Sequence, residues 1–146
     1  MQLEPDSARA RDARLPDSEA CAALVAALGR FAVVDLETTG LDAETSRVIE
    51  VGVVLLAPGE EPVLFERLID PGVPVPPLTQ HLTGIGDADL RGAPSWAEVA
   101  PQVAELTRGA IVVAHNAAFE QAFLCRAVEP GTQFLDTLEL ACVLRP

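Results

Sequence analysis

The chain contains no lysine and no tyrosine, and only one tryptophan and three cysteines among its 146 residues. All ten basic residues are arginines, and 22 acidic residues oppose them, so the formal net charge is −12. A domain of this sign cannot hold a long duplex by neutralising phosphates with its own cations. It can hold the end of a strand if metal ions screen the acids, or if another domain or a partner supplies the basic surface.

Three further scarcities narrow the class of protein. Cys21, Cys125 and Cys142 are odd in number and widely spaced, which favours reduced core thiols in a cytoplasmic protein over a disulfide framework or a zinc site. No apolar run approaches the roughly 20 residues that span a bilayer, and the polar N-terminus has no apolar core of a secretory signal. We therefore expect a cytoplasmic protein without a membrane partner. The segment GIG (84–86) lacks the strand–turn–helix setting of a phosphate loop, which weighs against general nucleotide binding.

The order of the expected elements indicates one domain of the α/β class. Residues 1–15 are expected to form a mobile arm, and a short helix follows that ends at Gly29, so residues 1–29 precede a domain over 30–146. The pattern βββαβαβα implies a mixed sheet, antiparallel for its first three strands and parallel afterwards, with helices packed on it. The expected strands are 31–36, 47–56, 63–70, 110–116 and 132–137. The expected helices are 95–109, 118–128 and a last one from about 138. A Pro-rich loop (71–77) and a further loop are expected between the third strand and the helix over 95–109.

The segment FAVVDLETTG (31–40) carries the strongest chemical signal. Because strand side chains alternate between faces, Asp35 and Glu37 are expected to point the same way at the end of an apolar strand. An Asp-x-Glu pair at a strand end is more often two solvated acids, but two adjacent carboxylates also suit Mg²⁺ or Mn²⁺. Thr38 and Thr39 add two hydroxyls, and Gly40 is expected to permit a tight turn with positive φ.

A second polar cluster follows the buried strand AIVVAHN. His115 and Asn116 end that strand, which is a place where sites form in α/β sheets, and Glu120 lies in the first turn of the next helix. Considered singly, His115 and Asn116 are as typical of turns and helix caps as of sites. Glu120 alone is most simply a solvated acid that interacts favourably with the helix dipole.

These segments together resemble the DEDD family of 3′–5′ exonucleases, and most closely its DEDDh group. VVDLETTGLD followed by IEVGVVLL resembles the first motif of that family, and HLTGIGDADLRGAPSWAEVAP resembles the loop and helix after its third strand. VVAHNAAFEQAFL resembles the second motif, and LDTLELACVLRP resembles the segment that leads toward the third. The likeness covers about residues 30–146, and four linked segments in the right order are far more specific than one motif.

The resemblance implies a ribonuclease H-like fold and a two-metal hydrolase that releases nucleotides from the 3′ end of nucleic acid. Asp35, Glu37 and Glu120 would be the catalytic metal ligands, for two Mg²⁺ or Mn²⁺ ions. The substrate is expected to be DNA rather than RNA, as a single strand, with a polymerase or helicase as partner or fused domain. The residues that the resemblance would place at the substrate are Thr38, Thr39, Asn116, Phe119 and Ile85; for Phe119 a core position is an equal alternative.

The sequence departs from the family pattern in two ways. The second motif normally ends in Asp, and the extra methylene of Glu120 moves the carboxylate by more than about 1 Å, whereas metal sites tolerate only about 0.2 Å. The third motif, a His with an Asp five residues later, has no counterpart, since the only histidines are His81 and His115. We therefore expect a C-terminally incomplete domain that lacks its final helix, and little activity from these 146 residues alone. The alternative is a catalytically degenerate module that keeps the fold for protein or nucleic-acid interaction.

Overall fold

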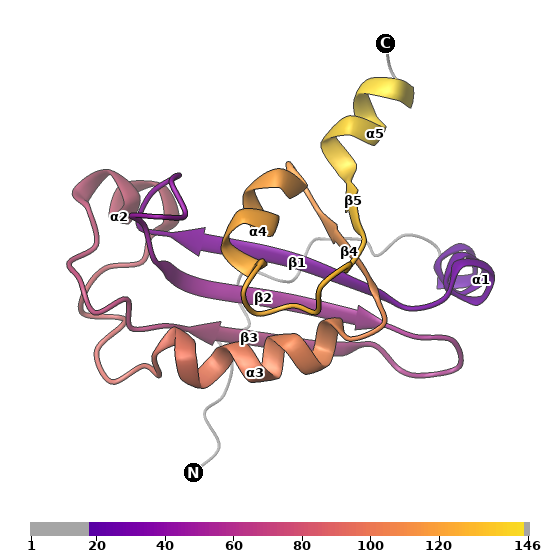
Figure 1. Cartoon of the computed structure of the whole chain (residues 1–146), viewed down its shortest axis with the longest axis horizontal. Coiled ribbons are helices and arrows are strands. Elements are labelled where there is room, and N and C mark those ends of the chain that lie inside the picture. Colours follow the sequence, from indigo (N-terminus) through magenta and orange to yellow (C-terminus); the bar gives the residue numbers. More distant parts are fainter. Residues whose placement is uncertain (1–17, 145–146) are drawn as a thin grey trace.

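A computed structural model describes residues 18–144 of the chain, and the expected N-terminal arm lies outside these residues. The described part of the chain folds into five strands and five helices, and their arrangement is drawn in Figure 1. The helices are α1 (Ser18–Leu28), α2 (Pro77–Thr83), α3 (Trp96–Thr107), α4 (Ala117–Leu124) and α5 (Thr137–Leu144). The strands are β1 (Phe31–Thr38), β2 (Val48–Leu56), β3 (Val63–Leu68), β4 (Ile111–Ala114) and β5 (Phe134–Asp136).

The strands form one mixed sheet in the order β3-β2-β1-β4-β5. β1 pairs antiparallel with β2, and β2 pairs antiparallel with β3. β4 and β5 continue the sheet on the other side of β1 as parallel strands. This arrangement confirms the predicted α/β class, with an antiparallel meander followed by parallel strands, and it makes β1 the central strand.

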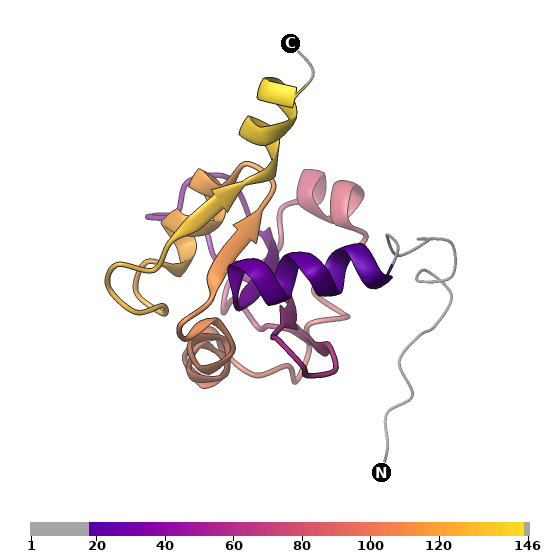
Figure 2. The same cartoon turned by 90° about the vertical axis from the view of Figure 1, so that its right-hand side faces the viewer.

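Helices cover the two faces of the sheet unequally. α3 and α4 lie on one face, and α1 lies on the other (Figures 1 and 2). The main core forms beneath α3 and α4, where the even-numbered side chains of β1 meet Val103 and Leu124, both fully buried. On the opposite face Val33 remains 40% exposed. The alternation that predicted the two faces of β1 is therefore realised, with the apolar side chains inward and the acids on the less covered face.

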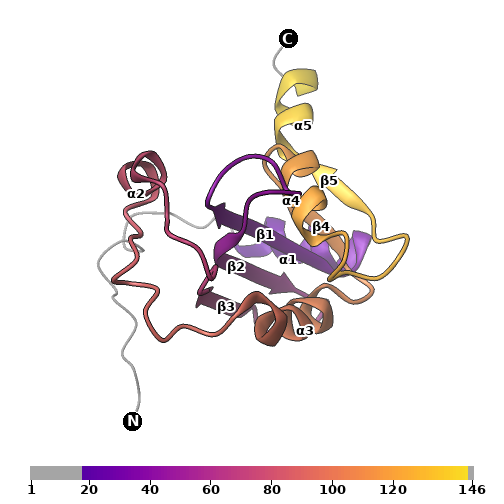
Figure 3. The same ribbon diagram turned by 60° about the vertical axis from the view of Figure 1, so that its left-hand side comes forward.

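The segment after the Pro-rich loop forms a helix, α2, that the sequence analysis had interpreted as loop. Pro77 occupies its first turn, where a missing amide hydrogen costs nothing and a fixed φ favours the helix. Gly84 ends it in the left-handed conformation, with φ of 77°. α2 stands beside the end of β1 (Figure 3), and the Thr79 hydroxyl donates a hydrogen bond to the Thr39 carbonyl at 3.2 Å.

The prediction of core thiols is wrong for two of the cysteines. Cys125, which follows the end of α4, and Cys142 of α5 are exposed; the side chain of Cys21 lies outside the described part. In α1, Val25 is buried and Leu28 is 58% exposed.

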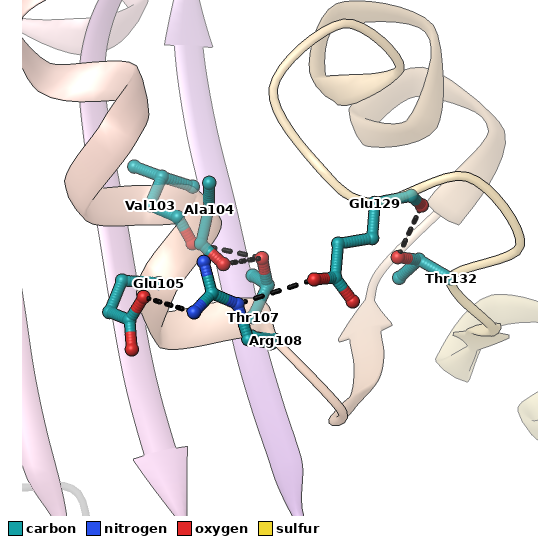
Figure 4. Close-up of polar contacts among 7 residues, drawn as sticks. All are labelled: Val103, Ala104, Glu105, Thr107, Arg108, Glu129 and Thr132. Carbon is teal, nitrogen blue, oxygen red and sulfur yellow. Dashed lines mark hydrogen bonds and ion pairs between the residues drawn. The ribbon is translucent and has the colours of Figure 1, made fainter.

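An arginine links the end of α3 to the loop before β5. The Arg108 guanidinium lies 2.9 Å from the Glu105 carboxylate and 3.2 Å from that of Glu129 (Figure 4). The Thr132 hydroxyl donates to the Glu129 carbonyl at 2.7 Å and closes the same loop. All three charged side chains are more than half exposed, so the ion pairs order this loop more than they stabilise the fold.

The last helix, α5, projects away from the sheet (Figures 1 and 3). Its large apolar side chains are exposed, namely Leu138, Leu140, Val143 and Leu144. Among the described residues, no helix combines the length and the apolar character that crossing a membrane requires.

Candidate functional site

The end of β1 presents two carboxylates side by side. Asp35 and Glu37 point to the less covered face of the sheet. The alternate residues Leu36 and Thr38 are buried on the opposite face. Burial raises the pKa of Glu37, and the neighbouring charge of Asp35 raises it further. The two acids therefore repel each other in the absence of a cation, as the alternation of the strand predicted.

The turn after β1 is braced by its own threonines. The Thr38 hydroxyl donates to the Gly40 carbonyl at 2.6 Å. The Thr39 hydroxyl accepts a hydrogen bond from the Arg47 amide at 2.9 Å, and the Thr39 amide donates to the Arg47 carbonyl. Gly40 does not adopt the positive φ that we expected. A Cβ at this position would lie 2.8 Å from the Ser46 hydroxyl oxygen, so any other residue would require that hydroxyl to rotate away.

Two further carboxylates lie on the same face as Asp35 and Glu37, and the sequence analysis missed both. Glu50 of β2 is directly opposite Glu37, and Glu66 of β3 is opposite Gly52, one pleat along from Glu50. Burial raises the pKa of Glu50 to about 6, with Glu66 and then Glu37 adding like-charge repulsion. The strand pattern indicates the face of each acid, but only the register of the sheet brings them together.

Glu120 is buried, in contrast to the solvated first-turn acid that its position alone suggested. It is 4% exposed, and among the described residues its Oε2 atom has no hydrogen-bond partner. Burial raises its pKa, and the charges of Asp35 and Asp136 add to that effect. A bound cation would supply the partner that this buried carboxylate oxygen lacks.

The other predicted site residues lie around this centre in different environments. Asn116 adopts the left-handed conformation before α4, with φ of 64°, and its side chain does not cap the helix. Phe119 is half-buried and packs against the main core, with its ring centroid 5.0 Å from that of Phe123. Ile85 is buried in a second small cluster with Ile49 and Leu90, under α2 and the loop that follows it. The substrate roles of these residues stay predictions.

The junction between β5 and α5 holds the start of α4, and the sequence analysis missed this role too. The Asp136 carboxylate accepts hydrogen bonds from the Asn116 and Ala117 amides, both at 3.0 Å. It also accepts one at 2.8 Å from the Leu138 amide at the start of its own helix. An Asp between a strand and a helix signals an N-cap, but sequence gives no sign that one carboxylate caps two helices.

The oxygen donors fit a hard divalent cation in kind. Asp35 and Glu37 supply adjacent carboxylates, and Glu120 supplies a buried one with an unpaired oxygen. Within residues 18–144, however, no three His, Cys, Asp or Glu side chains converge closely enough to enclose one ion. The arrangement is an open pair of acids on β1, with a third on α4 close enough for the charge of Asp35 to act on it.

Comparison with known sequences assigns the chain to a family. The family model described as exonuclease (RNase T) matches residues 32–145. A PolC-type DNA polymerase III of Caldanaerobacter subterraneus subsp. tengcongensis is 37% identical over 118 residues, which are 77% of this chain and 8% of that protein. The PolC-type DNA polymerase III of Listeria innocua is 39% identical over 122 residues, 80% of this chain and 8% of that protein. The chain thus spans less than a tenth of the length of these relatives.

Solved structures agree with the fold. Exonuclease X in complex with 5′ overhanging duplex DNA has a TM-score of 0.65 and 26% identity, over 80% of this chain and 64% of that one. E. coli exonuclease I in complex with a dT13 oligonucleotide has a TM-score of 0.68 at 16% identity, over 81% of this chain and 30% of that one. The second likeness bears on the fold alone.

Proposed function

This chain belongs to the RNase T family of exonucleases, and from that membership we propose that it is a metal-dependent 3′–5′ exonuclease domain acting on DNA. The observation that carries the proposal is the pair of carboxylates on β1, Asp35 and Glu37, with Glu120 buried beside them. The proposed cations are Mg²⁺ or Mn²⁺, for which carboxylate oxygens are the preferred ligands.

In the proposed reaction the chain's own residues hold and orient the scissile phosphate. Asp35 and Glu37 project from the rigid central strand, so the positions of their oxygens are fixed by the sheet. Bound divalent cations would supply an activated water and would stabilise the charge that develops on the phosphate and on the leaving oxygen. Thr38 and Thr39 brace the adjoining turn, and the backbone there is proposed to lie against the terminal nucleotide.

The substrate and context follow from the relatives. PolC-type DNA polymerases III share this segment at 37–39% identity, and exonuclease X has been solved with DNA. We therefore propose DNA, as a single-stranded 3′ end, and a place beside or within a replicative polymerase. Such a setting supplies the basic surface that a chain of net charge −12 lacks.

A second candidate is a catalytically degenerate module that uses the nuclease fold for interaction. Two observations favour it: the second motif ends in Glu120 instead of Asp, and no three metal-binding side chains converge within the described residues. Metal binding separates the two functions, since an interaction module has no need of a cation.

The test is a titration of the 146-residue chain with Mn²⁺, with the free ion followed by electron paramagnetic resonance. A nuclease site predicts saturable binding that Asp35→Asn weakens by about tenfold or more. Glu60→Gln is the matched control, because Glu60 lies in the exposed turn between β2 and β3. Absence of saturable binding, or equal binding by wild type and Asp35→Asn, would favour the interaction module.

Polarity and substrate are tested on oligonucleotides at high protein concentration with Mn²⁺. A 5′-labelled DNA strand is expected to shorten one nucleotide at a time, and a phosphorothioate at its 3′ terminus is expected to block the reaction. RNA of the same sequence should be cut more slowly. Cleavage that starts at the 5′ end, or that survives in Asp35→Asn, would contradict the proposed reaction.

A further inference from the structure

The corner where β5 passes into α5 contacts every residue of the turn that leads into α4. We propose that Asp136, assisted by Thr137, is a positioning residue that fixes the Glu120 carboxylate through the first turn of α4. The inference rests on the proposed function only in assigning Glu120 a role at the metal site. The contacts themselves join two adjacent residues, Asp136 and Thr137, to the four residues 114–117.

Asp136 supplies the cap that α4 lacks. Asn116 stands at the N-cap position in the left-handed conformation, with φ of 64° and ψ of 55°, and its own side chain makes no capping bond. The first free amides of the helix instead donate to Asp136, Asn116 to Oδ1 and Ala117 to Oδ2. Partial burial alone would raise the pKa of Asp136, but the backbone hydrogen bonds lower it, so the carboxylate stays ionised as an acceptor.

Thr137 fixes the other half of the turn. Its hydroxyl donates to the Ala114 carbonyl at 3.2 Å and lies 3.1 Å from Nδ1 of His115. The contact with His115 is a second hydrogen bond of the same hydroxyl, in which the tautomer of the imidazole decides which partner donates.

Glu120 depends on this anchoring because its side chain leaves the first turn of α4. It follows Asn116 by one helical turn, it is 4% exposed, and its Oε2 has no hydrogen-bond partner in the described part of the chain. The position of that oxygen therefore follows the backbone of the helix and the packing around the side chain. The extra methylene of Glu relative to Asp makes its reach depend more strongly on where α4 begins.

The experiment separates positioning from charge and from general stability. The 146-residue chain is titrated with Mn²⁺ as Asp136→Asn, as Thr137→Val and as Glu139→Gln, each alone and combined with Glu120→Gln. Thr137→Val removes the bonds to the turn without changing charge. Glu139→Gln is the matched charge control, because this exposed acid lies in the first turn of α5 and its side chain accepts no hydrogen bond from α4.

Positioning predicts that Asp136→Asn weakens Mn²⁺ binding by about tenfold, the usual size of the effect when a group behind a metal ligand is lost. Thr137→Val should weaken it by about threefold, and Glu139→Gln by less than twofold. In the Glu120→Gln background neither Asp136→Asn nor Thr137→Val should weaken binding further, since the residue that they position is gone. Equal weakening in both backgrounds, or an effect of Glu139→Gln as large as that of Asp136→Asn, would overturn the proposal.

A second readout stands apart from metal binding. The side-chain carboxyl resonance of Glu120 is followed by carbon-13 NMR in wild type, Thr137→Val, Asp136→Asn and Asp70→Asn, without added metal. Thr137→Val is the decisive variant because it changes no charge, whereas the charge of Asp136 itself acts on Glu120. Asp70 is the control because it is an exposed aspartate that accepts a backbone amide from Gly72, within its own turn. A shift in Thr137→Val and in Asp136→Asn but not in Asp70→Asn supports positioning even if the wild type binds no Mn²⁺, an outcome that would refute only the proposed function. An unchanged Glu120 resonance in a folded Thr137→Val protein would overturn it.

Discussion

Replacing Glu50 by Gln is expected to stabilise the metal-free protein above pH 6 and to leave it unchanged near pH 4.5. Glu50 lies between the charges of Glu66 and Glu37, and its pKa in the folded state is about 6 against an ordinary value of 4.5. The folded state therefore binds the proton more tightly than the unfolded state does. Stability should fall as the pH rises from about 4.5 to about 6, and the loss should be complete above that window.

The magnitude follows from the size of the shift. Each unit of pKa difference corresponds to about 1.4 kcal/mol, so a rise from 4.5 to about 6 gives an upper limit of about 2 kcal/mol. Glu50 is only partly buried, so solvent and salt reduce the effect to roughly 1 kcal/mol. Gln has nearly the shape of the protonated side chain and carries no charge, so it should recover this amount above pH 6.

The assay is urea unfolding followed by circular dichroism at pH 4.5 and 7.5, in the presence of a chelator. Glu66→Gln should act in the same direction, because Glu66 contributes the largest like-charge repulsion on Glu50. Glu60→Gln, in an exposed turn, is the control and should leave the pH dependence as it is in wild type. A Glu50→Gln protein no more stable than wild type at pH 7.5 would refute the reasoning about this cluster.

Three predictions concern the scaffold and are measured by the same unfolding assay. Leu124→Ala should destabilise the protein by about 2–5 kcal/mol, because this fully buried side chain joins α4 to the main core; a loss below about 1 kcal/mol would contradict its place there. Asn116→Val should cost about 1–2 kcal/mol, since a β-branched residue resists the left-handed conformation, whereas Asn116→Gly should be nearly neutral. Arg108→Ala should change stability by less than about 0.5 kcal/mol despite its two ion pairs, which are exposed to solvent, and a larger loss would show that they matter to the fold.

The fold and the shared face of Asp35 and Glu37 were readable from sequence because both follow from residue patterns along the chain. Alternation along β1 predicted that Asp35 and Glu37 share a face, and the order of strands and helices predicted the mixed sheet. The helix expected over 95–109 is α3, whose local signals are the capping box at Ser95 and the helical spacing of the buried Val99 and Val103. Each of these signals lies within a dozen residues of the structure that it specifies.

The features that sequence missed depend on which distant segments meet. Glu50 is an ordinary acid in a strand until the register places it opposite Glu37. Asp136 signals a cap for its own helix, but its bonds to α4 cross twenty residues of sequence. Gly40 shows the same limit, because glycine was expected for its φ, whereas the structure shows no positive φ there and a close approach of the Ser46 hydroxyl instead.

The distribution of charge accounts for how so acidic a chain can have a nucleic-acid end as its proposed substrate. Asp35, Glu37, Glu50 and Glu66 lie together on one face of three neighbouring strands, and burial and mutual repulsion raise the pKa of both Glu37 and Glu50. Acids that destabilise one another in this way make a fold that gains free energy whenever a cation binds to it and not to the unfolded chain. The negative charge that would repel a phosphate is thus concentrated at the place where a bound divalent cation would neutralise it. A basic surface that attracts nucleic acid from a distance would then have to come from a neighbouring domain or partner.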